Sequence, residues 1–417
     1  MSESFKITIP DYVCAVMAEI NKFSLFPDED YLRGKSYVVG GCVRDALLGR
    51  TPNDWDVTTN LPAEEILNIF SALPGFDAYP TGIEHGTVTV VRDNLPVEVT
   101  TFRFDVGYVN HRHPTAVLFL DSIDRDLERR DFTINAMAYS PESGIIDLNG
   151  GAHDLENGII RCVGKPEERF DEDALRIIRA LRFASVLDFE IEKDTAKAAL
   201  DLRGLLTFIS RERITSELEK LLCGKAAARV LRDFHLIIED IFPALAGDSV
   251  IRAAEYVSKL GDAAYPLKLA ALLSDIEPHR IQGAFMNLRL DNKTRRHAEN
   301  ILLHLHTELG DNAALKRLCR DIGSDAARDV IRLGIARSER DDSLLRTLSD
   351  ICTSGECFTT AELRISGKEL LSMGAIPHEI GKILDTLLER VIKNELPNDQ
   401  TALQGAADTL INRKETT

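Results

Sequence analysis

Hydrophobic and polar positions alternate in two different ways along the 417 residues. In the N-terminal part, short runs of β-branched residues with a period of two predict strands, for example at 85–91 and 97–102. The polar stretch 92–96 between these two runs predicts a hairpin connection. Residues 62–73 predict a helix, because proline, alanine and two glutamates occupy its first turn. The N-terminal part is therefore expected to be a small domain of strands and helices.

The pattern changes near residue 157, after which leucine and alanine recur at intervals of three and four residues. This spacing is typical of amphipathic helices, and strand-like runs are no longer evident. We therefore expect an α+β domain over residues 1–156, followed by all-α regions over 157–225 and 226–417.

The composition of the chain indicates in which cellular compartment the protein works. Hydrophobic residues make up 44% of the chain, and no apolar run approaches the roughly 20 residues of a membrane helix. No signal-peptide pattern precedes the first domain. The seven cysteines are scattered without CxxC spacing, which argues against a disulfide framework or zinc site and favours the reducing cytoplasm. The net charge of −17 argues against a nonspecific nucleic-acid binder, but not against a nucleic-acid enzyme, because the local field decides contact.

The segment 36–59, SYVVGGCVRDALLGRTPNDWDVTT, carries the most chemistry. An apolar run ends in Gly40 and Gly41, which predicts a strand, a glycine turn and a helix start where backbone N–H groups can reach a phosphate. Asp54 and Asp56 are one residue apart, so a strand would place both carboxylates on one face. Neighbouring carboxylates repel unless a cation lies between them, and oxygen ligands suit Mg²⁺. A phosphate cradle beside such a pair indicates nucleotidyl transfer.

Each half of the segment also has an ordinary explanation. A Gly-Gly pair after a strand is by itself a tight turn, and an isolated Asp-x-Asp is a solvated strand end or a turn. The combination, together with Arg44 and Asp45 between the two halves, carries the functional interpretation.

This combined pattern resembles a known family. Residues 40–49, GGCVRDALLG, and the following Asp54-x-Asp56 resemble the head-domain signature of class II tRNA nucleotidyltransferases and bacterial poly(A) polymerases. Both belong to the polymerase-beta-like nucleotidyltransferase superfamily. The resemblance implies a polymerase-beta-like catalytic head at 1–156, a helical neck that recognises the nucleotide base at 157–225, and a helical body and tail that bind tRNA at 226–417.

The resemblance also implies a third catalytic carboxylate. Glu98 lies in the middle of a predicted strand, on the opposite face from Val97 and Val99. Within the segment EVTTFR it matches the third acid of the family, although alternation alone also explains an exposed glutamate there. Asp54 and Asp56 would hold Mg²⁺, and Glu98 would assist them or help to deprotonate the primer 3′-hydroxyl.

Arg130 and Asp131, in the segment 126–136, match the second family motif, which contacts the sugar and phosphates of the incoming nucleotide. Without the resemblance, an exposed Arg-Arg-Asp at a helix start would be unremarkable. In the glycine turn, Gly40, Gly41 and Arg44 are further candidate nucleotide-binding residues.

The segment 172–183 contains residues that can select the base of the incoming nucleotide. Asp173 and Arg176 are three residues apart, and on a helix they would share a face. An acceptor beside a donor matches the edges of cytosine and adenine, whereas uracil and guanine present the reverse order, so the pair can select CTP and ATP without a template. The alternative is an ordinary intrahelical ion pair. Glu172, Asp173 and Arg176 match the family's EDxxR element, and Arg179 and Arg182 would face the triphosphate.

Two further segments match the family. Residues 105–114 correspond to a flexible loop that accompanies addition of the terminal adenosine, although Asn110-His111-Arg112-His113 departs from the usual acidic and arginine-rich run. Residues 211–222 correspond to the last motif, for which we expect a helix that braces the preceding one.

These observations predict template-independent addition of CCA to the 3′ end of tRNA from CTP and ATP, with release of pyrophosphate. The expected partners are the 3′ end and elbow of tRNA, the two nucleotides and Mg²⁺, with no membrane. The alternatives are an enzyme that adds only A or only CC, a bacterial poly(A) polymerase, and an inactive RNA-binding module. The oligomeric state, monomer or homodimer, stays open.

Overall fold

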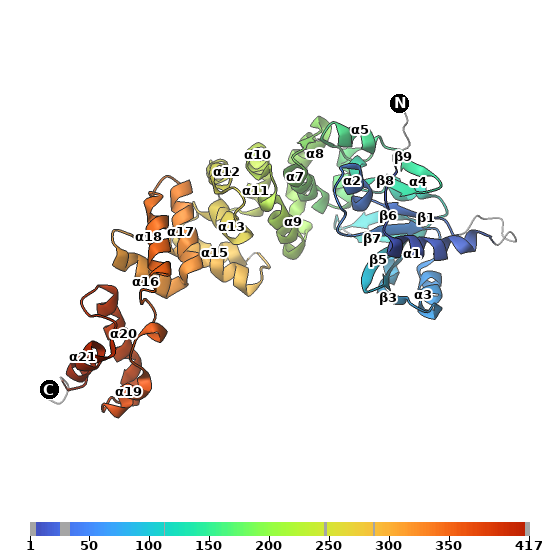
Figure 1. Cartoon of the computed structure of the whole chain (residues 1–417). Helices are drawn as coiled ribbons and strands as arrows, with labels where there is room; N and C mark the ends of the chain where they lie inside the picture. The colour runs from blue at the N-terminus through green and yellow to red at the C-terminus, as the bar shows by residue number, and fades with distance from the viewer. Residues whose placement is uncertain (1–5, 26–33, 112, 246–247, 287, 413–417) are drawn as a thin grey trace. The chain divides into compact units, whose positions relative to one another are not determined.

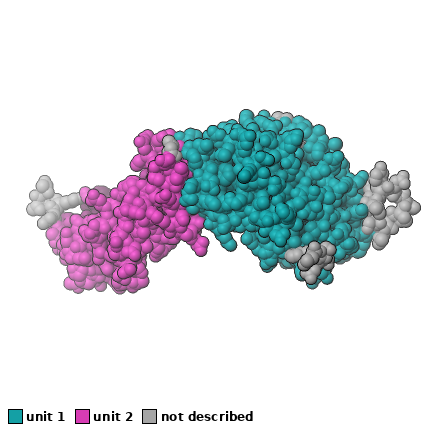
Figure 2. Space-filling view, turned by 90° about the horizontal axis from the view of Figure 1, so that it is seen from above, with its two compact units in different colours: residues 1–243 teal, residues 244–417 magenta. Residues whose placement is uncertain are grey.

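The computed structural model describes residues 6–25, 34–111, 113–245, 248–286 and 288–412. Figure 1 shows a strand-rich N-terminal part and helices through the rest of the chain. The chain forms two compact units, residues 1–243 and 244–417, which Figure 2 draws in different colours. None of the helices within the described ranges is long and apolar enough to cross a membrane.

The first unit is built on a seven-stranded mixed sheet. In spatial order its strands are β3 (Asp77–Gly82), β4 (Thr87–Arg92), β5 (Leu95–Thr101), β2 (Asp56–Thr59), β1 (Ser36–Val39), β8 (Met137–Ser140) and β9 (Gly144–Asp147). The helices α1 (Asp11–Asn21) and α3 (Ala63–Ala72) pack against this sheet and bury their apolar sides, including Val16, Ile66 and Phe70. The predicted helix at 62–73 is therefore confirmed.

The order of the strands places carboxylates from distant segments side by side. β2 and β5 are parallel neighbours, and their register pairs Asp56 with Glu98. Val97 and Val99 are fully buried while Glu98 is exposed, as the alternation predicts. β4 and β5 form the predicted hairpin, and both residues of its turn, Asp93 and Asn94, have positive φ, which suits the twist of a two-residue hairpin.

A second, two-stranded sheet is formed by β6 (Arg103–Val109) and β7 (His113–Phe119), which pair antiparallel. Residues 105–114 match a loop that is flexible in the family. Those of them that the structure describes lie in this hairpin, with Asn110 and His111 in the turn at positive φ, and residue 112 lies outside the described part. The strand preference of residues such as Val106 and Val109 favours the hairpin.

The remaining elements of the first unit are helical, with one exception. Two-residue strands β10 (Ile159–Ile160) and β11 (Glu190–Ile191) pair in parallel, so the expectation of helices alone after residue 157 was wrong in this detail. Strands this short carry no periodic signal. The helices are α2 (Gly41–Leu47), α4 (Ile123–Glu128), α5 (Gly151–Glu156), α6 (Pro166–Glu172), α7 (Leu175–Leu187), α8 (Lys193–Asp201), α9 (Arg211–Cys223), α10 (Ala227–Asp233) and α11 (His235–Ile241), with short 3₁₀ turns η1 (Lys22–Leu25), η2 (Ile83–His85), η3 (Thr133–Asn135) and η4 (Arg203–Phe208).

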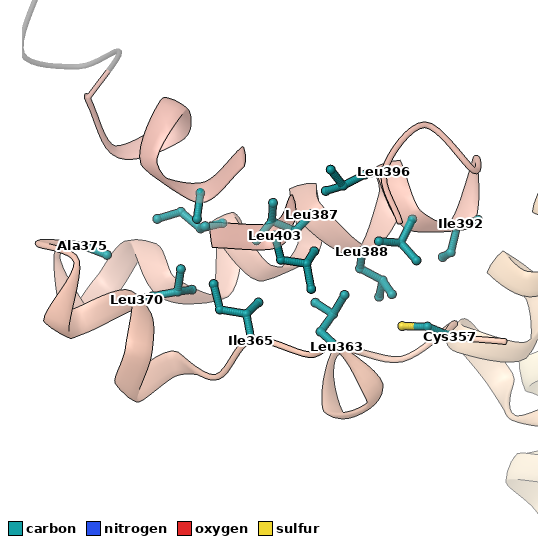
Figure 3. Close-up of a cluster of buried hydrophobic side chains, with 13 residues drawn as sticks. Cys357, Leu363, Ile365, Leu370, Ala375, Leu387, Leu388, Ile392, Leu396 and Leu403 are labelled. Carbon is teal, nitrogen blue, oxygen red and sulfur yellow. The ribbon is translucent and has the colours of Figure 1, made fainter. Parts of the chain in front are cut away.

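The second unit is all-helical over its described residues, and its last part has a core of its own. Figure 3 shows Leu370, Leu387 and Leu403, from three successive helices, among a cluster of buried apolar side chains. The helices are α12 (Ser249–Leu260), α13 (Tyr265–Leu273), α14 (Pro278–Met286), α15 (Asn292–His304), α16 (Asn312–Ile322), α17 (Ser324–Ala336), α18 (Ser343–Thr353), α19 (Gly367–Ser372), α20 (Ile380–Ile392) and α21 (Gln400–Asn412), with 3₁₀ turns η5 (Thr360–Glu362) and η6 (Pro377–Glu379).

Candidate active site

The candidate carboxylates gather at one end of β2. Asp56 is its first residue and pairs with Glu98 across the parallel ladder. Asp54 lies in the bend before the strand rather than in it, so the expectation that both aspartates share a strand was wrong. Pro52 and Asn53, which favour turns, precede it and delay the start of the strand. Trp55, which is buried, separates the two aspartates and anchors the bend.

The electrostatics of Asp56 show how closely these groups approach. Burial, followed by the negative charges of Glu98 and Asp54, raises the pKa of its carboxyl from 3.8 to about 6, while Arg130 opposes this shift. Negative charges that raise the pKa of a carboxyl must lie near it. The three predicted carboxylates are thus brought together, and a cation placed among them would relieve their repulsion.

The residues fit Mg²⁺ by the chemistry of their donor set. Mg²⁺ keeps several waters and is usually held by one or two carboxylates together with substrate phosphates, not by a closed protein cage. Within the described ranges, no group of three or more His, Cys, Asp or Glu side chains forms such a cage. Asp54 and Asp56 beside an open cavity are the kind of partial ligand set that this ion uses.

The glycine turn lies next to the carboxylates. Gly40 has a φ of 81°, and a Cβ there would stand 3.0 Å from Nη1 of Arg130. The positive φ and the close approach both favour glycine. The N–H of Gly40 donates to the carbonyl of Met137 at 3.1 Å, so any contact of the turn with a phosphate comes from Gly41 and the start of α2.

Arg44 has a different place from the one expected. Its guanidinium donates to Asp45 at 2.9 Å and to Asn135 at 2.7 Å, and it lies 5.2 Å from the centre of the Phe183 ring. It does not line the main cavity. The contacts join α2 to η3 and α7, which indicates that Arg44 supports the turn.

The main cavity of the first unit has a volume of about 480 Å³ and is lined almost entirely by charged side chains. A smaller cavity of about 200 Å³ contains Asp56 and Glu98 and shares Arg103, Arg129 and Arg130 with it. The lining residues of the main cavity are His85, Arg103, Asp105, Tyr108, Arg129, Arg130, Asp131, Asp173, Arg176, Arg179 and Arg213.

Asp131 holds an arginine in the wall of this cavity. Its carboxylate accepts from Arg179 at 2.6 and 2.9 Å, from Asn135 at 3.2 Å and from the backbone N–H of Phe132 at 2.8 Å. Although burial opposes the charge, Arg179 and these hydrogen bonds hold the pKa of Asp131 at about 2. Asp131 is therefore a permanent anion that orients Arg179.

Arg130 lies between the carboxylates and the cavity. Its guanidinium donates to the buried Asp126 at 3.1 Å, and Arg129 donates to the same carboxylate at 2.7 and 3.0 Å. These two arginines hold the pKa of Asp126 below its ordinary value despite burial. One buried anion thus positions two guanidinium groups at the border of both cavities.

Asp173 and Arg176 both line the main cavity, but their local structure differs from the expectation. Asp173 ends α6 in an extended conformation and α7 begins at Leu175, so the two residues do not share a helix face. Asp173 pairs with Arg213 of α9 at 2.9 Å. Each member of the pair is therefore positioned by other groups.

Arg176 is buried, and both terminal nitrogens of its guanidinium donate hydrogen bonds. It donates to Glu172 at 2.6 Å and to the carbonyls of Arg169 at 3.0 Å and Arg129 at 2.9 Å. Charged hydrogen bonds of this kind are strong and directional. Glu172 thus orients Arg176 and does not itself line the cavity.

Arg182 is not brought to the main cavity. It donates to the buried Glu217 of α9 at 2.8 Å and lies 3.5 Å from the centre of the Phe183 ring. Arg179 also approaches Glu217, at 3.7 Å. These contacts hold α7 against α9, the arrangement we expected for residues 211–222.

Several lining residues were not singled out as site residues from the sequence. Arg103, Asp105 and Tyr108 of β6 form one wall, and His85 precedes β4. The alternation of Arg103 and Asp105 after Phe102 is a signal for one polar strand face. Nothing in the local sequence indicates that this face meets α6 and α7, because the meeting depends on the fold.

Families of known proteins match three successive regions of the chain. The family described as the poly A polymerase head domain matches residues 36–161. Residues 188–247 match the probable RNA and SrmB-binding site of polymerase A, and residues 267–407 match a putative second domain of tRNA nucleotidyltransferase.

Individual relatives are similar to this chain along most of its length. The chain is 34% identical to a CCA-adding enzyme of Lactobacillus delbrueckii subsp. bulgaricus over 382 residues, covering 88% of this chain and 92% of the relative. It is 35% identical to that of Pediococcus pentosaceus over 388 residues, covering 90% and 94%.

Solved structures show the same fold. A crystal structure of the Bacillus stearothermophilus CCA-adding enzyme in complex with CTP is 31% identical, covers both chains fully and superposes with a TM-score of 0.78. A Thermotoga maritima CCA-adding enzyme complexed with tRNA, 21% identical, covers 96% of both chains with a TM-score of 0.66 and supports the fold alone. The chain belongs to the family of class II CCA-adding enzymes and poly(A) polymerases.

Proposed function

We propose that this protein adds C, C and A to the 3′ end of tRNA from CTP and ATP, without a nucleic-acid template, and releases pyrophosphate. The observation that carries the proposal is similarity to CCA-adding enzymes along about nine-tenths of the chain. The geometry agrees with this similarity, since a carboxylate cluster adjoins an arginine-lined cavity that also contains Asp173 and Arg176.

The carboxylates would carry the chemical step. Asp54 and Asp56 would hold Mg²⁺, which when bound supplies charge neutralisation at the phosphates and activation of the attacking hydroxyl. Glu98 lies next to Asp56 and is exposed, so it can accept a hydrogen bond from the 3′-hydroxyl of the tRNA. The protein's own contribution is positioning and electrostatic stabilisation.

The arginines would bind the triphosphate. Arg129, Arg130 and Arg179 line the cavity as cations that buried aspartates hold in place. A fixed guanidinium loses little freedom when it binds a phosphate, and its donors match phosphate oxygens. Gly41 at the start of α2 would add a backbone donor.

Base selection would come from Asp173 and Arg176. The carboxylate accepts from the amino group of cytosine or adenine, and the guanidinium donates to the adjacent ring nitrogen. UTP and GTP present the opposite order and would leave buried groups unpaired, which discriminates strongly. Arg213 and Glu172 orient the two groups and so would contribute to selectivity without contacting the base.

The rest of the chain would bind tRNA. We assign catalysis to residues 1–156, base recognition to 157–225 and contact with the tRNA elbow to 226–417. We place the enzyme in the cytoplasm, because its seven cysteines are scattered along the sequence without CxxC spacing.

An extension assay tests the proposal. Purified protein and Mg²⁺ are mixed with tRNA transcripts that end before CCA or after CC, and with each nucleotide singly and together. Addition of C, C and A followed by a stop is the expected product. Extension of only one transcript would indicate a partial enzyme. A long ladder of added A residues would indicate a poly(A) polymerase. Binding of tRNA without extension would indicate a non-enzymatic module.

Arg176→Ala tests base selection separately. Removing the donor should lower CTP and ATP use and raise the share of UTP or GTP incorporated, measured with single nucleotides on the same transcripts. Glu172→Gln keeps the size of the neighbouring side chain but weakens its hold on Arg176, so it should show a smaller change in the same direction. Unchanged selectivity in Arg176→Ala would refute this account.

A further inference from the structure

Tyr108 of β6 lines the main cavity, and the proposed function gives it no role. Among the described side chains that line this cavity it is the only one with a benzene ring, since the others are arginines, aspartates and one histidine. Charged groups bind phosphates and read the edge of a base, but the flat face of a base is best held by an aromatic ring. The cavity therefore offers one ring for that purpose.

The backbone turns Tyr108 toward the cavity. Strict alternation along β6 would place it on the opposite face from Arg103 and Asp105, with the exposed Phe104 and Val106. It lines the same cavity as Arg103 and Asp105. Gly107 between them has a φ of 56°, outside the strand region, and this local turn accounts for the change of face.

Gly107 also leaves no room for a larger residue. A Cβ built there would lie 2.6 Å from Oγ1 of Thr115, on the neighbouring strand β7. Both the positive φ and the close contact therefore require glycine at the position that redirects Tyr108. The orientation of the ring is built into the hairpin.

The environment of Tyr108 keeps its phenol neutral. Burial and the negative charge of Asp105 raise its pKa to about 12. Its hydroxyl donates to Oδ2 of Asp105 at 3.3 Å. Arg176 and Glu172 are close enough to influence the same group, so the ring lies near the residues that would read the base edge.

The tip of the hairpin is attached to that same region. The carbonyl of His111 accepts from the N–H of Ala174 at 3.1 Å, and Nδ1 of His111 donates to the carbonyl of Asp171 at 2.9 Å. The imidazole ring lies 4.9 Å from the ring of Phe208. These contacts hold the strand that carries Tyr108 against the segment that carries Asp173.

We propose that Tyr108 contacts the incoming nucleotide by stacking on the face of its base, while Asp173 and Arg176 read the edge. The inference rests on the proposed function and adds a substrate-contacting residue to it. Stacking does not depend on the pattern of donors and acceptors, so Tyr108 serves both CTP and ATP. Because a purine offers the larger surface, ATP should depend on it more.

Binding of CTP and ATP in the absence of tRNA, measured by isothermal titration calorimetry, tests the proposal on the full chain. Tyr108→Phe keeps the ring and should bind both nucleotides within about twofold of the wild type. Tyr108→Ala should weaken binding by roughly tenfold or more, and more for ATP than for CTP. Tyr79→Ala, an exposed tyrosine on β3 outside the cavity, is the matched control and should change neither affinity.

Single-turnover extension distinguishes this inference from the proposed function. Tyr108→Ala should raise the nucleotide concentration needed for half-maximal rate and leave the saturated rate within about threefold. If the alanine variant melts at a lower temperature, Tyr108→Leu, which keeps the apolar volume, should still lose affinity. Wild-type affinity in either folded variant overturns the inference, whereas a wild-type protein that binds nucleotides and fails to extend tRNA overturns the function instead.

Discussion

At the scale of single residues, buried anions hold the arginines of the cavity in place. Asp126 and Asp131 are buried, and each accepts several charged hydrogen bonds from these arginines. Removing one partner of such a pair costs more than the pair contributes, because the other charge is left unpaired. The stability of the first unit and the geometry of its cavity are therefore linked.

Asp131→Asn tests this link through its pH dependence. The folded pKa of about 2 lies below the usual 3.8, so the charge stabilises the fold fully above the unfolded value and loses this effect as the pH falls toward 2. We expect the variant to lose roughly 2 kcal/mol of unfolding free energy at pH 7 and progressively less between pH 4 and 2. Urea unfolding followed by the fluorescence of Trp55, the chain's one tryptophan, measures the difference.

Asp121→Asn is the control, because this aspartate is exposed and its substitution should leave the unfolding curve unchanged at every pH. A constant destabilisation of Asp131→Asn down to pH 3 would show that its charge is not the cause.

Asp56→Ala separates chemistry from binding. Asp56 lies where burial and two neighbouring carboxylates already disfavour its charge, so its loss should not unfold the domain. Transfer should fall by at least about a thousandfold, as expected when a metal ligand is removed. tRNA affinity, measured by filter binding, should stay within about twofold, and loss of binding together with activity would make the residue structural.

At the scale of elements, the site is formed where three pieces meet: the neighbouring central strands β2 and β5 of the sheet, the β6–β7 hairpin, and the helices α6, α7 and α9. Ion pairs connect α7 and α9. Glu217 is buried between Arg182 and Arg179, at 2.8 and 3.7 Å. Besides buried apolar residues of both helices and the hydrogen bond from Ser185 to the carbonyl of Leu221, this carboxylate helps to pair α7 with α9.

Glu217→Ala should therefore weaken the first unit strongly. Arg182 would lose its carboxylate partner and Arg179 would keep only Asp131, which costs on the order of 3 kcal/mol and lowers the melting temperature by roughly 5–10 °C. Glu219→Ala, at an exposed position on the same helix, should shift it by less than about 2 °C. Equal shifts in the two variants, measured by differential scanning calorimetry, would contradict the role given to the buried carboxylate.

At the scale of the whole molecule, the two compact units divide after Pro243, and the carboxylates and both cavities belong to the first unit. Residues 1–243 should fold alone, because that unit has its own buried core. The isolated unit should bind CTP and ATP within about threefold of the full chain. Its affinity for tRNA should fall at least roughly tenfold, because the surfaces proposed to hold the elbow are missing.

Calorimetry with nucleotides and filter binding with tRNA compare the fragment with the full chain. Undiminished tRNA affinity of the fragment would place all tRNA contacts in the first unit and refute the role proposed for residues 226–417.

The amino-acid sequence by itself determined the local elements and the chemistry they carry. Periodicity located the β4–β5 hairpin and the helix α3, the spacing of Asp54 and Asp56 indicated a carboxylate pair, and the family resemblance added Glu98. Local elements depend on residues that are close in the sequence, so the pattern of hydrophobic and polar side chains predicts them. The proposed catalytic and base-reading residues were found at this level, although Asp54 lies outside its strand and Asp173 lies between two helices.

Only the tertiary structure decided which side chains meet. The parallel pairing of β2 with β5 sets Asp56 beside Glu98, and the hairpin brings Tyr108 to the region of Arg176. The same packing directs Arg44 and Arg182 to structural contacts, because the buried Asn135 and Glu217 accept their hydrogen bonds. Contacts between distant segments depend on strand order and helix packing, which local patterns do not contain.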